Sequence, residues 1–330
     1  MKLDIELTGK CNLKCVMCPQ SFGIANGEMT REDFMRILPT IEKAEQVTLH
    51  GVGEPILEFA LETIPPHVDI FFNTNATLLK KDRSELLLKY HKKIKYINVS
   101  LDAATPETYE KIRGGRLDLV LRNLREFKEM RDALGLSYPL IYLNMTIMKE
   151  NVDELKGLIL LSKEFDSIIE TWPLNDDGMY GGKKWVVSRK NWSFVYEDQV
   201  VSKFEEKYKQ TVLEAKELAT SVGVKFNMWD AWFEKLDIST CTLPKDTLNF
   251  YANGELKHCC FQTKPLLDWR ESALSQETYL AQTEKVMKPM KNSQIPAECS
   301  QSRCPWVKGE TSPFEVRDSN RILDLRIATK

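Results

Sequence analysis

The chain has 330 residues, 46 of them basic and 48 acidic, so its formal net charge is -2. This near balance, without a polybasic block, gives no electrostatic reason to expect a nucleic acid or a membrane surface as a partner. No stretch approaches the roughly 18 apolar residues that span a bilayer, and no signal-peptide core precedes the first strand, so we expect a cytoplasmic protein. In a reducing compartment its eight cysteines are not expected to form four disulfides, and their clustering at both ends of the chain favours metal binding.

Three cysteines follow the first expected strand, which covers residues 2–7. Cys11, Cys15 and Cys18 have a C-x3-C-x2-C spacing. Three thiolates can bind three irons of a cubane and leave the fourth iron without a protein ligand. Ferredoxin loops use C-x2-C-x2-C with a further cysteine, and zinc sites usually have paired C-x2-C arms, so both fit less well. A zinc loop remains the alternative.

Strand-like runs recur at about 46–50, 68–73, 95–101, 140–147 and 167–172, with helical patterns between them. Thr30 and Asp33 favour a helix start, and Asn151 with Glu154 resembles a capping box before another helix. One helix has an apolar stripe made of Leu117, Val120, Leu121, Leu124, Phe127 and Met130. Six strand-then-helix units predict an α/β protein whose parallel sheet forms a partial (β/α)6 TIM-like barrel over residues 1–190.

Polar motifs follow three of these strands, at the edge where ligands of parallel sheets bind. Residues 51–55 read Gly-Val-Gly-Glu-Pro, where glycines allow close backbone approach and a carboxylate can receive a cationic amine. Residues 73–77 and 98–102 offer side chains that suit ribose hydroxyls. A strand-to-helix turn is the alternative for the first motif, and helix N-caps are the alternative for the other two.

Together the cysteine loop and these motifs resemble the radical S-adenosylmethionine (radical SAM) enzymes. The resemblance implies that a 4Fe-4S cluster on Cys11, Cys15 and Cys18 binds the amino and carboxylate groups of SAM at its open iron. One electron, from a donor such as flavodoxin or ferredoxin, then cleaves SAM to a 5'-deoxyadenosyl radical. The motif that contacts the SAM amino group corresponds to Gly53 and Glu54, although Val52 departs from its commonest form.

The resemblance implies further SAM contacts around the strand ends. Ser100 and Asp102 are expected near the ribose, and Asn75 belongs to the polar motif after the third strand. Asn144, Met148 and Asn151 are expected on the adenine side, where Met17 of the cysteine loop packs on the base. Taken alone, Met17 would be assigned to the core.

The rest of the chain divides into two expected segments. Residues 191–235 are expected to bridge two domains, because a helical pattern runs to about residue 222, with an apolar docking face of Phe194, Val201, Phe204, Tyr208 and Val212. Residues 236–330 are expected to form a small domain. Asn253 and Gly254 predict a β-hairpin there, with the positive φ values of a type I' turn.

The small domain holds the remaining five cysteines. The spacing of Gly254 to Cys259 and of Cys299 to Cys304 resembles the shortened twitch version of the SPASM auxiliary-cluster domain. That resemblance implies a second 4Fe-4S cluster bound by Cys241, Cys259, Cys299 and Cys304. A structural zinc ion with four cysteines is the alternative.

Cys260 is left over in this ligand count. If strand alternation continues through residues 257–261, Cys259 and Cys260 point to opposite faces, so only one can reach the cluster. A bulge in the hairpin would exchange their roles. Cys260 is then either an inert buried thiol or a thiol that returns a hydrogen atom to a substrate radical.

Hydrogen return by Cys260 leads to the expected reaction, epimerisation of a small polar substrate such as an aminoglycoside. The alternatives are a dehydrogenase that oxidises its substrate through the auxiliary cluster, a peptide-modifying maturase, and a non-enzymatic iron-sulfur or zinc scaffold. Residues 175–190 and 229–232 are candidate walls of a substrate pocket. No general base can be assigned from the sequence.

Overall fold

The computed structural model describes residues 1–23, 27–55, 58–174, 186–189, 191–228, 246–259, 265–271 and 276–292. Within these residues one sheet runs in the order β12-β11-β10-β1-β2-β3-β4-β5-β6-β9, and β7 pairs with β8. The strands are β1 (Lys2–Ile5), β2 (Gln46–Leu49), β3 (Asp69–Thr74), β4 (Ile94–Ser100), β5 (Leu140–Ile147), β6 (Ile168–Pro173), β7 (Val186–Arg189), β8 (Trp192–Val195), β9 (Lys225–Met228), β10 (Thr247–Phe250), β11 (Glu255–Lys257) and β12 (Leu267–Asp268).

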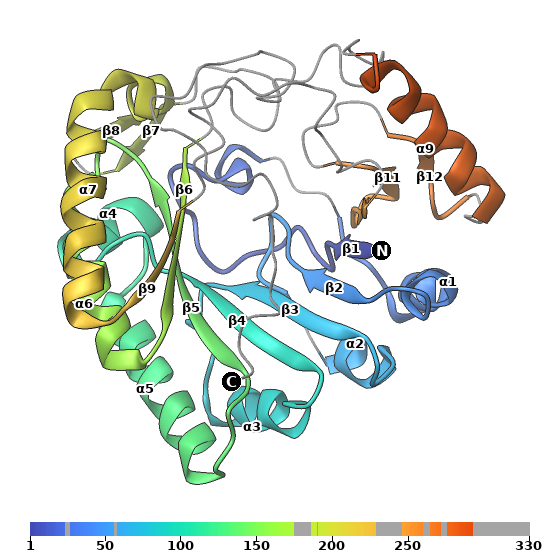
Figure 1. The fold of residues 1–330 in the computed structure, drawn as a ribbon, viewed down its shortest axis with the longest axis horizontal. Coiled ribbons are helices and arrows are strands. Elements are labelled where there is room, and N and C mark those ends of the chain that lie inside the picture. Colours follow the sequence, from blue (N-terminus) through green and yellow to red (C-terminus); the bar gives the residue numbers. More distant parts are fainter. Residues whose placement is uncertain are drawn as a thin grey trace.

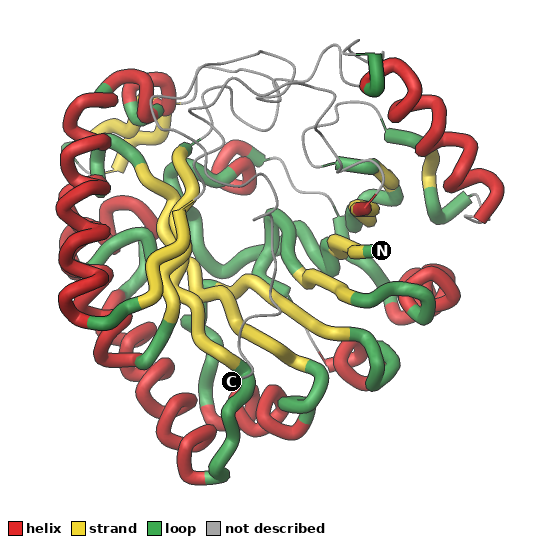
Figure 2. Tube along the Cα trace, viewed as in Figure 1, coloured by secondary structure: helices red, strands yellow, loops and turns green. Residues whose placement is uncertain are grey.

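The helices lie on the outer side of this curved sheet (Figures 1 and 2). They are α1 (Arg31–Ile41), α2 (Glu58–Thr63), α3 (Lys81–Lys89), α4 (Pro106–Arg113), α5 (Leu117–Ala133), α6 (Leu155–Phe165), α7 (Glu205–Val222) and α9 (Gln276–Met290). Short 3-10 turns are η1 (Pro19–Phe22), η2 (Val152–Glu154), η3 (Tyr196–Asp198) and η4 (Val201–Lys203). None of the described helices is both long enough and apolar enough to cross a membrane.

The six predicted strands are confirmed as β1 to β6, each parallel to the next. Their alternation separates two faces. Outer-face residues such as Ile5, Leu49 and Ile70 are fully buried in one large apolar cluster with the helices. On the inner face Phe71 and Tyr96 stack with ring centroids 4.4 Å apart, in a separate cluster. The helices therefore bury one face of the sheet and leave the inner face to carry polar groups.

Local sequence signals explain where several helices begin and which side they bury. Thr30 caps α1 in a complete capping box, since the Asp33 N–H donates to Thr30 Oγ1 at 3.0 Å and the Thr30 N–H donates to Asp33 Oδ2 at 3.1 Å. The stripe on α5 is confirmed, with Leu117, Val120, Leu124 and Phe127 buried. These signals fix the helices against the outer face of the sheet.

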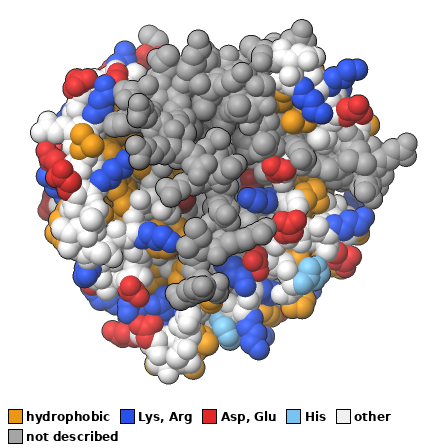
Figure 3. Space-filling model, in the orientation of Figure 1, with side chains coloured by type: hydrophobic (Ala, Val, Ile, Leu, Met, Phe, Trp, Pro, Cys, Tyr) orange, Lys and Arg blue, Asp and Glu red, His pale blue; other side chains and the backbone are white. Residues whose placement is uncertain are grey.

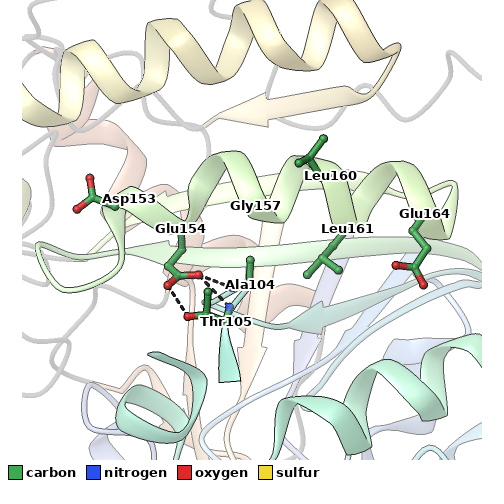
Figure 4. Close-up of a pocket in the computed structure, with 8 residues that line it drawn as sticks. All are labelled: Ala104, Thr105, Asp153, Glu154, Gly157, Leu160, Leu161 and Glu164. Atoms are coloured by element: carbon green, nitrogen blue, oxygen red, sulfur yellow. Dashed lines mark hydrogen bonds between the residues drawn. The ribbon is translucent and has the colours of Figure 1, made fainter. Parts of the chain in front are cut away.

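The predicted capping box at Asn151 and Glu154 is wrong. Asn151 makes no side-chain cap, and Glu154 instead accepts hydrogen bonds from the N–H groups of Ala104 and Thr105, both at 2.9 Å. Figure 4 shows this carboxylate bonded to residues 104 and 105, which line a pocket together with it. Glu154 thus satisfies the start of α4, a helix distant in sequence, because the fold brings the turns after β4 and β5 together.

The predicted helix from residue 191 is also corrected. The helix α7 begins at Glu205, and the preceding residues form β8 and two 3-10 turns. Phe194 packs with Tyr196 and Val200, whereas Tyr208 and Val212 pack in the main core. Because β9 then pairs parallel with β6, residues 205–228 add a further helix and strand to the sheet. The division of the chain into three domains stays a prediction.

The predicted hairpin is confirmed, but its turn type is wrong. β10 and β11 pair antiparallel around Tyr251 to Gly254, and the Gly254 N–H donates to the Tyr251 carbonyl at 3.0 Å. Gly254 has a φ of +98°, whereas Asn253 has no positive φ. A single left-handed glycine after an i to i+3 bond is a turn with a bulge, so the type I' geometry is not required.

Basic and acidic side chains are mixed on the described surface (Figure 3), in line with their nearly equal numbers in the sequence. Figure 3 shows Lys and Arg side chains interspersed with Asp and Glu over the described part of one face. Single ion pairs across this surface include Arg31 with Glu62 and Arg125 with Glu164. Exposed pairs of this kind contribute little to stability, roughly 0 to 1 kcal/mol each.

Candidate functional site

The cysteine loop follows β1 and curls back at η1. Cys15 is buried, and Cys11 and Cys18 are half-buried. The Leu13 N–H donates to Cys11 Sγ at 3.4 Å, and Ser21 Oγ donates to the Cys15 carbonyl at 2.7 Å. These short-range bonds hold the three thiols in one compact loop.

Three polar residues attach this loop to the carboxyl end of β3. Asn75 Nδ2 donates to Asn12 Oδ1 at 2.9 Å and lies 3.7 Å from Cys11 Sγ. Asn12 Nδ2 in turn donates to Thr77 Oγ1 at 2.7 Å. Asn75, predicted as a SAM contact, therefore lies against the first cysteine of the loop. Thr77 belongs to the predicted polar motif at 73–77, whereas Asn12 carried no clear signal in the sequence, because its contacts join residues 63 to 65 positions apart.

Gly53 has a steric reason to be glycine. A Cβ at this position would overlap the backbone oxygens of Thr8 and Lys10, which belong to the segment entering the cysteine loop. The next residue, Glu54, donates its N–H to the Lys10 carbonyl at 2.9 Å. The turn after β2 is thereby packed directly on the chain that leads to Cys11.

Glu54 lies at this junction with its carboxylate held in place. It is 8% exposed and accepts hydrogen bonds from Thr74 Oγ1 and from the Asn75 N–H, the latter at 2.8 Å. Burial raises the pKa of the Glu54 carboxyl, while the two hydrogen bonds oppose that rise. Each carboxylate oxygen has a second lone pair, so the group can still receive an ammonium group.

Asp102 and Asn151 join the turns after β4 and β5. Asp102 is 1% exposed, accepts the Thr146 N–H at 2.7 Å, and forms an ion pair with Arg113. Asn151 donates to the carbonyls of Asp102 and Thr146, both at 2.9 Å, and accepts the Met148 N–H at 2.7 Å. Both side chains are therefore occupied mainly with the protein itself.

The other predicted SAM contacts lie close by. Ser100 ends β4, half-buried, in register with Asn144 of β5. Met148 is fully buried in an apolar cluster with Val16, and Met17 packs against that cluster. The structure thus places most of the predicted residues around the carboxyl ends of β1 to β5, as expected for ligand contacts in a parallel sheet.

Arg113 was missed as a functional candidate. It lies at the last position of α4 and is 7% exposed. A signal was present, because Arg113 follows Ile112 and lies one turn after Tyr109, on the side of α4 that both residues bury. A charged residue on a buried helix face requires a partner, and the sequence does not show which one.

The thiols fit an iron-sulfur cluster in their chemistry. Burial raises the pKa of Cys15. Burial is also the largest cause that raises the pKa of Cys18 to about 12, and the neighbouring Cys15 is the second. Neutral thiols must lose protons when they bind metal. Among the described residues no three His, Cys, Asp or Glu side chains converge as one ion requires. A cluster does not need such convergence, because each thiolate binds a different iron.

The predicted auxiliary site falls largely outside the described residues. Cys241, Cys260, Cys299 and Cys304 lie there, as do the proposed pocket walls at 175–185 and 229–232. Cys259 is half-buried, two residues beyond the end of β11. Since the strand ends at Lys257, the alternation used to separate Cys259 from Cys260 is not supported by the described strand.

Comparison with known proteins finds the radical SAM superfamily over residues 5–161. The curated GTP 3',8-cyclase of Clostridium botulinum strain Okra is 26% identical over 327 residues, which cover 91% of this chain and 94% of that protein. The GTP 3',8-cyclase of Clostridium botulinum strain Hall is 30% identical over 193 residues, which cover 53% of this chain and 57% of that protein.

Two solved structures resemble the fold. Streptococcus suis SuiB bound to its precursor peptide SuiA has a TM-score of 0.62 at 18% identity, covering 96% of this chain and 75% of SuiB. Native anSMEcpe with bound AdoMet and the Cp18Cys peptide has a TM-score of 0.59 at 15% identity, covering 93% of this chain and 87% of that chain. At these identities the likeness shows the fold alone.

The predicted reaction is wrong. An epimerase acting on an aminoglycoside-like substrate was expected, with a dehydrogenase or a peptide-modifying maturase as alternatives, whereas the relatives that match this chain are named GTP 3',8-cyclase. The prediction rested on Cys260 and on the spacing of the carboxyl-terminal cysteines. Those features describe metal binding and a spare thiol, and they contain no information about the shape of a substrate.

Proposed function

We propose that Cys11, Cys15 and Cys18 bind a 4Fe-4S cluster and that the protein cleaves SAM reductively, because residues 5–161 match the radical SAM superfamily. When bound, such a cluster supplies the electron that cleaves SAM to methionine and a 5'-deoxyadenosyl radical, which takes a hydrogen atom from the substrate. The observation that carries this proposal is the position of the three thiols after β1, against the Gly53–Glu54 turn and Asn75. The electron comes from a donor such as flavodoxin or ferredoxin.

The SAM site is proposed from the same geometry. Glu54 receives the SAM ammonium group, because it is a buried carboxylate with free lone pairs at the entrance to the cysteine loop. Gly53 lets the backbone approach, and Asn75 and Ser100 offer polar groups. Met17 and Met148 supply an apolar wall for adenine. Asp102 and Asn151 act by holding the turns after β4 and β5, since their side chains bond to the backbone there.

A guanine nucleotide is the proposed substrate, cyclised between C3' and C8 of GTP as the names of the relatives state. The support is the similarity to GTP 3',8-cyclase over nearly the full length of both chains. The inner face of β4 to β6 also offers suitable groups. Asn98 Nδ2 donates to Glu170 Oε2 at 3.2 Å, and the buried Asn98 Oδ1 has no hydrogen-bond partner among the described residues. A carboxylate and an amide oxygen match the N–H edge of guanine.

A second 4Fe-4S cluster in a twitch-type domain is proposed from the cysteine spacing, with Cys241, Cys259, Cys299 and Cys304 as ligands. The hairpin that precedes Cys259 supports this arrangement, because β10 pairs parallel with β1 and brings the segment beside the strand that leads to the first cluster. We assign no role to Cys260, because it was expected to return a hydrogen atom in the epimerisation, and that reaction is rejected.

The experiment is anaerobic turnover of reconstituted protein with SAM, dithionite and GTP carrying deuterium at C3'. We expect 5'-deoxyadenosine that contains one deuterium, because formation of a bond at C3' requires loss of that hydrogen. Unlabelled 5'-deoxyadenosine at a rate independent of GTP would contradict the proposed substrate and leave SAM cleavage standing. As a control, the variant with Cys11, Cys15 and Cys18 all changed to Ala should form none.

A further inference from the structure

Arg113 places a buried positive charge at the end of α4. The side chain is 7% exposed, and its Nη1 donates to Oδ2 of Asp102, which is 1% exposed. Taking an arginine out of water is costly, and a single carboxylate offsets the charge only when further hydrogen bonds complete the pair. The groups around Arg113, besides Asp102, therefore decide how its buried charge is stabilised.

The end of α4 lies directly against the cysteine loop. The Val16 N–H donates to the Ile112 carbonyl at 2.9 Å, which joins the residue after Cys15 to the residue before Arg113. A Cβ at Gly115 would lie 3.1 Å from a Leu13 methyl group, so the two segments are in close contact on both sides of Arg113. Cys15 and Arg113 are both buried at this contact.

One donor of Arg113 has no partner. Its Nε is buried and forms no hydrogen bond within the described part of the structure, although Nη1 is bonded to Asp102. An unpaired buried donor is destabilising, and more so on a charged group. The electrostatic coupling is consistent with the geometry, since burial lowers the pKa of Arg113 while the nearby Cys15 and Asp102 charges raise it above its usual value.

We propose that Arg113 is a positioning residue for the cluster on Cys11, Cys15 and Cys18, and that its buried charge, held against the segment that carries Cys15, raises the reduction potential of that cluster. The inference rests on the proposed function. Reduction adds one negative charge to a cluster, so a buried cation beside a ligand sulfur stabilises the reduced form. Asp102 fixes the guanidinium and partly offsets its charge.

The test is a redox titration of the reconstituted full chain without substrate, followed by electron paramagnetic resonance of the signal that changes when SAM is added. In Arg113→Met the midpoint potential should fall, with iron content unchanged. In Arg113→Lys, which keeps the charge on a shorter side chain, it should lie between those of Arg113→Met and the wild type. In Asp102→Asn, which removes the offsetting charge, the midpoint should rise.

Arg131→Met is the matched control. Arg131 is also buried, at 6% exposure, and it pairs with Asp132 on α5 and donates to the Pro139 carbonyl at 3.1 Å. None of the cysteines that the structure describes contacts this pair. Its loss should lower the melting temperature and leave the midpoint unchanged. Equal midpoints for Arg113→Met and the wild type, both with the cluster present and forming 5'-deoxyadenosine, would overturn the inference alone. A wild-type protein without that cluster would overturn the proposed function as well.

Discussion

At the scale of single residues, the site depends on a few side chains whose partners come from different strands. Glu54 follows β2 and takes its hydrogen bonds from Thr74 and Asn75, at the end of β3. The strand register places these residues side by side, because β2 and β3 pair in parallel. The carboxylate is thus fixed before any ligand arrives, which would reduce the entropy lost on binding of the proposed SAM.

Glu54→Gln should weaken SAM binding by about ten- to a hundredfold, because a hydrogen bond to a charged group contributes about 1.5–3 kcal/mol. The measurement is the SAM dissociation constant of the reconstituted protein, with iron content checked. Asp33→Asn is a suitable comparison, since this carboxylate also accepts a backbone N–H but caps α1. Equal weakening in both variants would show that the loss is a general effect on the fold.

Gly53→Ala should disrupt the cysteine loop, because the added methyl group meets the backbone oxygens of Thr8 and Lys10, which cannot move aside cheaply. We expect reduced iron loading, measured as iron per chain. Gly135→Ala provides the contrast: its φ is +65°, but no atom lies within 4 Å of the added methyl group. That variant should cost only about 1–2 kcal/mol of backbone strain and keep its iron. Full iron loading in Gly53→Ala would contradict the close packing.

The site residues that the sequence singled out belong to short contiguous motifs. The spacing of Cys11, Cys15 and Cys18 and the turn at Glu54 are contiguous patterns. Arg113 and Asn12 were not found, because their importance comes from partners that only the fold brings near. For the same reason Asn151 was misread, since its amide bonds to the turn after β4.

At the scale of elements, helix starts with complete local signals were predictable. Thr30 and Asp33 cap α1 as expected, and the stripe on α5 is buried as expected. The residues before α7 were wrongly predicted to be helical. Their apolar side chains have a helical spacing, but they pack into two different hydrophobic clusters. The spacing of apolar residues along the sequence indicates that they are buried. It does not show whether a helix or a strand holds them, because tertiary contacts decide that.

Thr30→Ala should destabilise the protein by about 1 kcal/mol, the usual cost of losing an N-cap. The change removes the hydroxyl that accepts the Asp33 N–H at the start of α1, whereas the backbone N–H of residue 30 can still donate to Asp33 Oδ2. Urea denaturation followed by circular dichroism would measure the loss. Thr30→Ser keeps the hydroxyl and should behave nearly as the wild type, and an equal loss in the Ser variant would show that the methyl group matters instead.

At the scale of the whole molecule, the sheet joins the two ends of the chain. β10 pairs parallel with β1, and Glu6 at the end of β1 accepts the N–H groups of Val52 at 2.7 Å and Ala252 at 3.3 Å. The segment that carries Cys259 is thereby attached to the strand that carries the first cysteine loop. The α/β class and the six parallel strands were predictable, whereas the reaction was not, because substrate choice depends on side chains gathered from many elements.

The central claim is that the cluster on Cys11, Cys15 and Cys18 has one iron without a protein ligand, and that this iron binds SAM. The most direct test is electron-nuclear double resonance on the reduced, reconstituted protein with SAM whose amino group carries 15N. We predict a 15N coupling to the cluster that disappears in Cys18→Ala. A reduced cluster of full iron content that shows no such coupling, with SAM in excess, would contradict the account.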